Sequence, residues 1–537
     1  MSWNYGDIID ALAAAVPPGN PCLVHGDAVV TWADFTRRTN NLAEAFRARG
    51  AVPGDKVAFY MRNRPAYLET LGACFKARLT HVNVNYRYVD EELWYILDNS
   101  DAKLVVYDAE FAPLVTRLQA RLPNVACWVE VGDGPPTTNF ALPFEPLARE
   151  GSGRSLSLQR YGDDTLLLYT GGTTGTPKGV IWTHEDHWRA LGSGATPATQ
   201  MLPPADLEAH VTNVRNAAGG RVGLPCCPLM HGTGLFTAIA IIAQGGTVVT
   251  LEGTQFDAEE LWDTVERRQV NSLAIVGDAF AKPMLRALDE NPRRWNLTSL
   301  LGIVSSGVMW SPEVKRGLLR HNPSMILSDS FGASEAVGFG RSDTTSNDAT
   351  EIAKFKIGEN CKVFTEDLRE VVPGSGEVGF VARSGPIPLG YYKDPEKTAR
   401  TFPVIDGVRY SMPGDYCRVE ADGTLVLLGR GSVCINTAGE KVYPEEVEET
   451  LKTHPSVQDA LVVGVPDEKW GQAVTAVVEL VPNATFDEEA LRGHVRERLA
   501  GYKTPKRVLA IDDLRRASNG KADYQAITAY AISHLGT

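Results

Sequence analysis

The chain has 537 residues, of which 43% are hydrophobic and 22% are charged, which is enough for about three to four domain-sized units. Its formal net charge of −13 argues against a nucleic-acid-binding surface, because neutralising phosphates requires a basic stripe. The eight cysteines lack zinc or redox spacing, and no apolar run approaches the roughly twenty residues of a membrane span. We therefore expect a cytoplasmic protein with reduced thiols, no membrane span and no nucleic-acid partner.

Helical and strand patterns alternate over the first 110 residues. Amphipathic stretches at 67–76 and 91–99 predict helices, and apolar runs at 80–84 and 103–107 predict buried strands. Repeated units of this kind predict a parallel sheet covered by helices. We therefore expect an α/β fold in which a large N-terminal domain of parallel sheets also contains a smaller β part. For 83–88 we expect a core and turn role.

A glycine- and threonine-rich loop lies between the apolar runs 166–168 and 180–182, which predict strands. Glycines let backbone N–H groups approach an anion, while threonine hydroxyls and a lysine add donors and charge. The loop has neither the Gly-Lys-Ser/Thr ending of a Walker A motif nor dinucleotide-fold spacing. It is either a flexible loop without a ligand or a phosphate cradle, and we favour the cradle, formed by Thr170, Gly171, Gly172, Thr173, Thr174, Gly175, Thr176 and Lys178.

Three features follow in the next hundred residues. The polar region 192–221 lacks periodicity and predicts a surface loop or lid segment. His231 lies in Pro-Leu-Met-His-Gly just before an apolar helix, where it could be an ordinary turn histidine or border a pocket. Asp278 precedes the helical run 279–288, where it could bind a substrate hydroxyl or be the N-cap of that helix, and we favour the N-cap.

Two strand ends carry groups suited to a nucleotide. The strand 301–305 runs into a small-residue turn with Ser306, Gly307 and Val308, against which a flat base could lie. The next strand ends in an aromatic residue, a glycine and an acid. There Phe331 could stack on a base, Ser334 could reach a phosphate and Glu335 could bind Mg²⁺. The candidate residues in this strand end are Asp329, Ser330, Phe331, Gly332, Ser334 and Glu335.

Asp415 lies in a Pro-Gly-Asp sequence, which could be an ordinary turn or could hold the two hydroxyls of a ribose, and Arg430 could donate to the ribose or to a phosphate. The C-terminal part begins after these residues. We place the domain boundary between residues 431 and 432, so that 1–431 form the large domain and 432–537 a small α+β lid. Pro444 predicts a helix start, and Thr485 to Glu488 reads as a capping box. Near the end, Asn519-Gly520 predicts a turn that presents Lys521.

The loop at 170–179 resembles the signature of the adenylate-forming enzymes, which include acyl-CoA synthetases, peptide-synthetase adenylation domains and luciferases. The other motifs also resemble those of this family, in the same order, and the resemblance covers nearly the whole chain. The string 276–283 is similar to one in actinobacterial acyl-CoA synthetases that act on steroid side chains. Departures are Ser334 for threonine, Pro413 before Asp415, and Ser432 where the family commonly has Asp or Lys at its hinge.

The resemblance implies that an acid and ATP·Mg²⁺ form an acyl-adenylate, which coenzyme A then converts to a thioester. It implies that Lys178 and the loop bind phosphates, that Glu335 with Thr170 binds Mg²⁺, and that Lys521 is the catalytic lysine. His231 would border the acyl pocket, and the lid would be mobile and swap Lys521 for the loop around Gly439.

Three points stay open at this level. The acceptor is free coenzyme A or a carrier protein, and a non-catalytic nucleotide-binding protein is the remaining alternative. The acid is a steroid side-chain acid or a medium- or long-chain fatty acid. The sequence is compatible with a homodimer but does not determine the oligomeric state.

Overall fold

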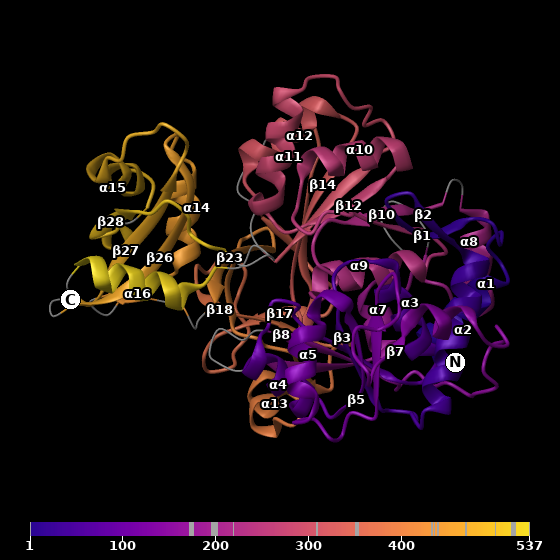
Figure 1. Cartoon of the computed structure of the whole chain (residues 1–537). Coiled ribbons are helices and arrows are strands. Elements are labelled where there is room, and N and C mark those ends of the chain that lie inside the picture. Colours follow the sequence, from indigo (N-terminus) through magenta and orange to yellow (C-terminus); the bar gives the residue numbers. More distant parts are fainter. Residues whose placement is uncertain are drawn as a thin grey trace. The chain divides into compact units, whose positions relative to one another are not determined.

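The computed structural model describes residues 2–170, 177–194, 202–217, 220–307, 310–348, 354–430, 433, 435–437, 440–467, 470–499, 501–516 and 522–535 (Figure 1). The chain forms two compact units. The first contains Met1–Gly338, Asp343–Thr350 and Ser384–Ser411, and the second contains Phe339–Ser342, Glu351–Arg383 and Met412–Thr537. The boundary expected after residue 431 falls within the second unit and stays a prediction.

The first unit contains a mostly parallel sheet that confirms the expected α/β class. Neighbouring strands in it are parallel except at β8–β9 and β9–β19. Its order is β19 (Gly390–Tyr391), β9 (Lys178–Thr183), β8 (Thr165–Thr170), β4 (Thr80–Asn83), β3 (Lys56–Tyr60), β5 (Ala102–Asp108), β6 (Cys127–Val131) and β7 (Leu142–Pro143).

Both faces of this sheet are buried, as the continuous apolar strands predict. Val57 and Phe59 of β3 point into one core cluster, whereas Ala58 and Tyr60 point into the other. This alternation follows from the two-residue period of a strand. Helices must therefore cover both faces.

A second run of strands in the first unit is parallel except for the terminal pair β1–β2. Its order is β14 (Ile326–Ala333), β13 (Gly302–Ser306), β12 (Ser272–Ile275), β10 (Val222–Pro225), β11 (Thr247–Thr250), β1 (Pro21–His25) and β2 (Ala28–Thr31). The predicted strands before Ser306 and Glu335 are thus neighbours, and their carboxyl ends meet at one edge, where ligands bind in open α/β sheets.

The helices of the first unit are α1 (Tyr5–Ala13), α2 (Trp32–Ala48), α3 (Pro65–Ala77), α4 (Asp90–Asn99), α5 (Ala112–Gln119), α6 (Phe144–Arg149), α7 (His184–Ala190), α8 (Leu207–Asn216), α9 (Gly232–Ile242), α10 (Ala258–Arg268), α11 (Asp278–Glu290), α12 (Pro312–His321) and α13 (Pro395–Thr401). The helices predicted at 67–76, 91–99 and 279–288 are present as α3, α4 and α11, with boundaries shifted by a residue or two.

Two expectations for this unit are wrong. The region 192–221 is not loop throughout, because Asp206 caps α8 and the helix buries His210, whose ring bonds to the carbonyl of Ala243. Asp278 is not an N-cap: Gly277 holds that position, and Asp278 is the first helical residue. Its carboxylate instead accepts bonds from the backbone N–H and hydroxyl of Ser311, the residue before α12.

The second unit has two sheets. One runs β17 (Cys361–Phe364), β18 (Val378–Arg383), β22 (Asp415–Val419), β23 (Thr424–Arg430) and β16 (Phe355–Ile357), followed by residues of β15 (Ala336–Thr344). The other runs β25 (Glu440–Val442), β24 (Ile435–Thr437), β27 (Gly471–Leu480) and β26 (Val457–Asp467), and β28 (Arg507–Ala510) pairs with β27.

Helices α14 (Pro444–Lys452), α15 (Glu488–Arg496) and α16 (Tyr524–Leu535) accompany the second of these sheets. Pro444 opens α14, as expected. The capping box at Thr485 is wrong, because Asp487 caps α15 and accepts the N–H of Ala490. The α+β character expected near the C-terminus is confirmed.

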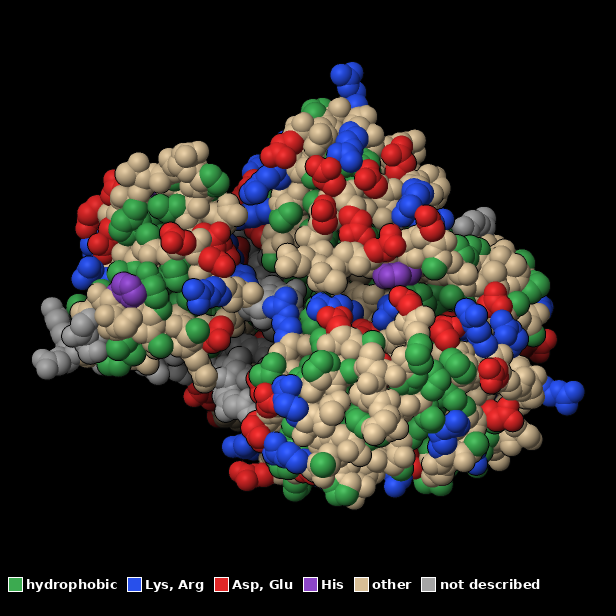
Figure 2. All heavy atoms as spheres, viewed as in Figure 1, with side chains coloured by type: hydrophobic (Ala, Val, Ile, Leu, Met, Phe, Trp, Pro, Cys, Tyr) green, Lys and Arg blue, Asp and Glu red, His purple; other side chains and the backbone are tan. Residues whose placement is uncertain are grey.

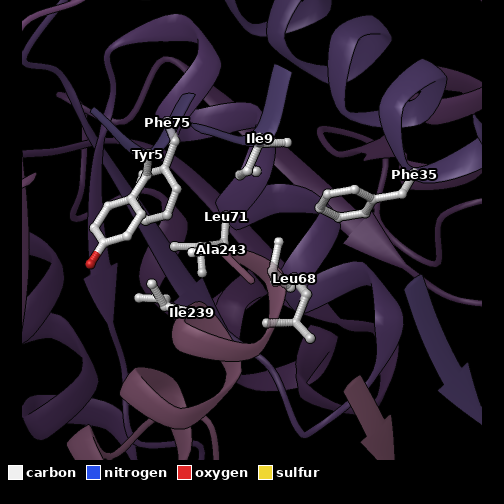
Figure 3. A pocket seen from close by; sticks show the side chains of 10 residues that line it. Tyr5, Ile9, Phe35, Leu68, Leu71, Phe75, Ile239 and Ala243 are labelled. Carbon is white, nitrogen blue, oxygen red and sulfur yellow. The ribbon is translucent and has the colours of Figure 1, made fainter. Parts of the chain in front are cut away.

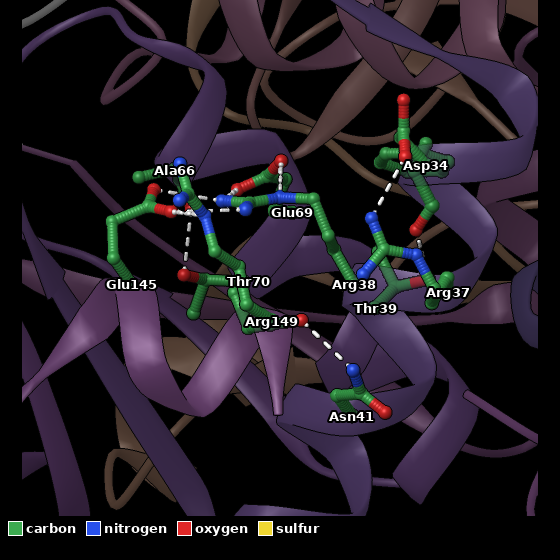
Figure 4. A network of polar contacts seen from close by, with 12 residues as sticks. Asp34, Arg37, Arg38, Thr39, Asn41, Ala66, Glu69, Thr70, Glu145 and Arg149 are labelled. Carbon is green, nitrogen blue, oxygen red and sulfur yellow. Dashed lines mark hydrogen bonds and ion pairs between the residues drawn. The ribbon is translucent and has the colours of Figure 1, made fainter. Parts of the chain in front are cut away.

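A partly buried guanidinium joins three helices of the first unit (Figure 4). Arg38 of α2 donates two bonds, of 2.6 and 2.9 Å, to Glu69 of α3, and two more to Glu145 of α6. Burial raises the pKa of Glu69, and the bonds from Arg38 oppose that rise. Such a pair is costly to break on one side only, because a buried charge would remain.

Acidic and basic side chains are interspersed on the face drawn in Figure 2. Among the described residues, no helix is long and apolar enough to cross a membrane. The seven described cysteines are all free thiols.

Two histidines are buried in an aromatic cluster in the first unit. His187 shares a 2.7 Å hydrogen bond with the hydroxyl of Tyr5. The ring of His184 packs against Phe75 and Tyr5, with centroids 4.7 and 5.3 Å apart, and neither of its nitrogens has a hydrogen-bond partner in the described part of the chain. Burial lowers the pKa of both histidines to about 3.

This burial predicts acid sensitivity. An unfolded histidine binds a proton near pH 6.5 and a folded one only near pH 3, so stability falls as the pH drops through this window. Each buried histidine should lower the free energy of unfolding by about 1–2 kcal/mol between pH 7 and pH 5. We expect His184→Phe, which keeps an aromatic ring, to reduce the drop in melting temperature between these pH values. The exposed His534→Gln should behave like the wild type, and an equal drop in all three proteins would contradict this account.

Candidate functional site

The predicted cradle connects two paired strands of the first unit. Strands β8 and β9 form an antiparallel pair in which Thr170 lies opposite Lys178. Six residues of the predicted cradle lie outside the described residues, namely Gly171, Gly172, Thr173, Thr174, Gly175 and Thr176. Thr170 and Lys178 are therefore brought together at the base of the loop, as a strand–loop–strand reading requires.

A buried amide ties this hairpin to the His231 turn. Asn83, at the end of β4, accepts the N–H of Tyr169 at 2.6 Å and donates to the carbonyls of Tyr169, at 2.9 Å, and Met230, at 2.6 Å. Its side chain is almost inaccessible, so these bonds replace water as partners. The core role expected for Asn83 is confirmed, and its effect is to hold two predicted motifs side by side.

The turn before His231 is held by side-chain-to-backbone bonds. Asn63 accepts the N–H of Leu229 at 2.7 Å and donates to the carbonyl of Cys227 at 3.1 Å. Gly234 cannot carry a side chain, because a Cβ would lie 2.5 Å from the carbonyl oxygen of Pro228. His231 itself precedes α9 and is only partly buried.

Lys178 has a carboxylate partner that sequence reasoning missed. Its ammonium lies 3.1 Å from Oδ2 of Asp394, and both side chains are partly exposed. Asp394 is the N-cap of α13 and accepts the N–H of Lys397 at 3.0 Å. The pKa of Asp394 is lowered first by this backbone bond and then by Lys178. The lysine is thus held at the base of the predicted cradle by a carboxylate that stays ionised.

The Glu335 carboxylate is buried and oriented. Oε1 accepts a 2.6 Å hydrogen bond from the hydroxyl of Tyr391 in β19, and the carbonyl of Glu335 accepts one from Ser411. The indole of Trp182 in β9 donates to the carbonyl of Ser334. The turn that carries Ser334 and Glu335 is therefore held by β9, by β19 and by Ser411.

The strand before this turn is also fixed by charge. Asp329 in β14 forms an ion pair with Lys315 of α12, and both side chains are buried. Phe331 is 7% exposed, and at Gly332 a Cβ would lie 3.0 Å from the carbonyl oxygen of Ala336. The ion pair gives Asp329 a structural partner beside its predicted contact with the base, which stays a prediction.

The edge of β13 carries the small-residue turn. Ser306 ends the strand opposite Ser330 of β14, and Gly307 has φ +97°, a conformation that favours glycine. Ser305 accepts the N–H of Gly277 at 2.9 Å, which ties this turn to the start of α11. Val308, the third residue of the predicted turn, lies outside the described residues.

In the second unit, Asp415 and Arg430 occupy opposite positions of one antiparallel pair. Asp415 opens β22 and Arg430 ends β23, and the two are register partners. Asp415 is buried, and the preceding Gly414 has φ +101°. The two residues are therefore direct neighbours in the sheet, although they are fifteen positions apart in the sequence. Lys521, Gly439 and the hinge residue Ser432 lie outside the described residues.

Sequence reasoning missed several residues that hold the candidate groups, among them Asn63, Lys315, Tyr391, Asp394 and Ser411. A signal existed for one of them. Asp394 is followed by Pro395, and an Asp-Pro pair before a helical run is typical of an N-cap and a first helical residue. No pattern linked it to Lys178, because 216 positions separate them along the chain.

The site suits a metal ion that is bound jointly by the protein and by a substrate phosphate. Mg²⁺ is commonly bound by one or two carboxylates together with phosphates and water. Glu335 supplies one buried carboxylate, and its bond to Tyr391 uses one of about four lone-pair positions. Within the described ranges, no group of three or more His, Cys, Asp or Glu residues could hold a metal ion by itself. The residues present therefore fit Mg²⁺ bound together with ATP.

A small cavity lies elsewhere in the first unit (Figure 3). Its lining comes from α1, α2, α3 and α9, and its side chains are apolar or aromatic: Tyr5, Ile9, Phe35, Leu68, Leu71, Phe75, Ile239, Ile242 and Ala243, with Gly72. None of the predicted site residues lines it. The cavity is a packing gap in the core and is not the candidate site.

Comparisons with known proteins identify the family of the chain. A family described as AMP-binding enzyme matches residues 11–392, and the AMP-binding enzyme C-terminal domain matches residues 446–521. The chain is 41% identical over 536 residues to the 3-oxocholest-4-en-26-oate–CoA ligase of Rhodococcus rhodochrous, covering 98% of this chain and 95% of that protein.

Two further matches extend this result. The medium/long-chain-fatty-acid–CoA/3-oxocholest-4-en-26-oate–CoA ligase of Mycobacterium marinum is 40% identical over 533 residues, covering 98% of this chain and 96% of the other. The crystal structure of an anthranilate CoA ligase in complex with anthranoyl-AMP has a TM-score of 0.85, at 22% identity, covering 100% of this chain and 98% of the other. It shows the same fold. The chain therefore belongs to the family of AMP-binding enzymes.

Proposed function

We propose that the protein is an ATP-dependent carboxylic acid–CoA ligase that forms acyl-CoA, AMP and pyrophosphate through an acyl-adenylate. The observation that carries this proposal is the pairing of Thr170 with Lys178 at the base of the loop, on the same unit as the oriented carboxylate of Glu335. One fixed cation and one fixed anion are what a Mg²⁺-bound triphosphate requires. Family membership and the named CoA ligases among the relatives support the same activity.

The chemistry needs fixed charge more than it needs a base. The substrate carboxylate is already ionised at pH 7, and it attacks an anionic α-phosphate. Lys178 and the loop hydroxyls would bind the β- and γ-phosphates, and Lys521 would contact the attacking carboxylate and the α-phosphate. Donors preorganised at developing charge lower the barrier, and loss of one typically costs about 10²–10³ in rate.

Glu335, with the hydroxyl of Thr170, would hold Mg²⁺, which when bound neutralises phosphate charge. Ser306, Gly307, Val308, Asp329, Ser330, Phe331 and Gly332 would receive the base, Ser334 a phosphate, and Asp415 with Arg430 the ribose. His231 would border the acyl pocket. The small C-terminal domain, residues 432–537, would exchange Lys521 for the loop around Gly439 between the two steps.

For the acid, we propose steroid side-chain acids and medium- or long-chain fatty acids. The relatives from Rhodococcus rhodochrous and Mycobacterium marinum are named for such substrates, and they align with this chain over nearly its whole length. The acceptor in this proposal is free coenzyme A. A cytoplasmic location and a homodimeric state remain predictions.

Replacing Lys521 should separate the two half-reactions. We expect Lys521→Ala to lower acid-dependent ATP–pyrophosphate exchange by about 10²–10³-fold, because the charge at the attacking carboxylate is lost. Thioester formation from supplied acyl-adenylate and coenzyme A should continue. The control is Arg515→Ala, which removes an exposed basic residue six positions earlier in the sequence and should leave both steps unchanged. Equal loss of both steps in Lys521→Ala would refute the assignment of this lysine.

A screen of acids tests the substrate class and the acceptor together. We expect coenzyme A-dependent AMP release with 3-oxocholest-4-en-26-oate or with medium- and long-chain fatty acids, and much less with short or aromatic acids. Thioester formation should be measured with free coenzyme A and, in parallel, with a phosphopantetheinyl carrier protein. Transfer to the carrier alone would contradict the proposed acceptor. Background pyrophosphate exchange with every acid would contradict the activity itself.

A further inference from the structure

A short segment of the first unit contacts both Lys178 and Glu335. In the proposed function, Lys178 binds the triphosphate and Glu335 binds its metal ion. This segment, residues 390–401, comprises β19 and α13. Tyr391 donates a 2.6 Å hydrogen bond to Glu335, and three residues later Asp394 lies 3.1 Å from the ammonium of Lys178. We propose that this segment is a positioning element, in which Tyr391 orients the Glu335 carboxylate for Mg²⁺ and Asp394 holds Lys178 ready for phosphate. The inference rests on the proposed function and adds residues to it.

The two contacts belong to one hydrogen-bonded turn. The hydroxyl of Thr398 accepts the N–H of Tyr391 at 2.8 Å and donates to the carbonyl of Asp394 at 2.7 Å. Gly390 has φ +148°, and a Cβ there would collide with Thr398. The close approach of β19 to α13 thus requires glycine, and it fixes Tyr391 and Asp394 relative to each other.

The segment is also attached to the strand that carries Lys178. Tyr391 lies opposite Val180 in the β19–β9 pair, and the N–H of Tyr392 donates to the carbonyl of Gly179 at 2.7 Å. Lys178, the turn at Glu335 and the segment therefore share one scaffold. A displacement of the segment would therefore move Asp394, the partner of Lys178, together with Tyr391, the partner of Glu335.

The expected effects differ for the two contacts. A residue that hydrogen-bonds a metal-binding carboxylate typically contributes 10- to 100-fold in metal affinity, because it fixes the carboxylate orientation. The Lys178–Asp394 pair is partly exposed, so its contribution is smaller. Pairing restricts a flexible lysine chain before the phosphate arrives, and for an exposed pair we expect at most about a fivefold effect.

Two conservative substitutions test the contacts separately. Tyr391→Phe removes only the hydroxyl and should raise the Mg²⁺ concentration needed for half-maximal ATP binding by about tenfold or more. Asp394→Asn keeps a good N-cap but removes the charge, and should weaken ATP binding up to about fivefold at saturating Mg²⁺. Both are measured by isothermal titration calorimetry of ATP binding without acid or coenzyme A.

The chain offers matched controls. Tyr392→Phe removes a 2.7 Å bond to the Asp101 carboxylate in the same segment, and Asp257→Asn changes the aspartate that caps α10. Neither should alter ATP or Mg²⁺ binding. Thr398→Val should shift both binding curves, since it breaks the shared turn, and Thr398→Ser should restore them.

Double variants distinguish positioning from general stability. The effect of Asp394→Asn on ATP binding should vanish when Lys178 is already glutamine, and that of Tyr391→Phe on Mg²⁺ dependence should vanish when Glu335 is already glutamine. Undiminished effects in these backgrounds would overturn the proposal, as would wild-type binding in both single variants or tighter ATP binding in Asp394→Asn. If the wild type itself binds no ATP with Mg²⁺, the proposed function fails, whereas unchanged variants of an active wild type refute only this inference.

Discussion

The candidate site depends first on the buried amide of Asn83. Three hydrogen bonds from this side chain join the end of β4 to the end of β8 and to the turn before His231. Each bond has both partners away from water, so loss of the amide would leave buried backbone groups unsatisfied, at about 1–3 kcal/mol for each. The strand that leads into the predicted phosphate loop and the turn that precedes His231 are therefore joined directly, although they lie about sixty residues apart in the chain.

In the same unit, the charged side chains of Lys178 and Glu335 already have fixed partners in the absence of substrate. Lys178 forms one short contact with Asp394, and Glu335 forms another with Tyr391. A flexible lysine and an acidic side chain would otherwise lose conformational freedom on binding ATP, and fixing them beforehand transfers that cost to folding. The same principle explains why adenylation can proceed without a general base. The barrier is mainly electrostatic, and preorganised charge lowers it.

Much of this arrangement could be predicted from the sequence, because its signals are local. Periodicity located helices α3, α4 and α11 and strands β4 and β5, and the Gly/Thr-rich segment was correctly placed between two strands. Two of the three errors arose where a partner distant in the sequence decided the outcome. Asp278 accepts hydrogen bonds from Ser311, which precedes another helix, and α8 lies in a polar stretch where His210 is buried and bonds to the carbonyl of Ala243. The third error was local, because Asp487 caps α15 in place of the expected Thr485. Tyr391 and Asp394 carried no signal of function, since their partners lie 56 and 216 positions away.

A crystal structure of the protein with Mg²⁺ and a non-hydrolysable ATP analogue tests the central claim most directly. The account predicts that the Lys178 ammonium contacts both Asp394 and a β- or γ-phosphate oxygen, and that Glu335 binds the metal while it keeps its bond to Tyr391. A triphosphate bound away from Lys178, with the metal held by groups other than Glu335, would contradict it.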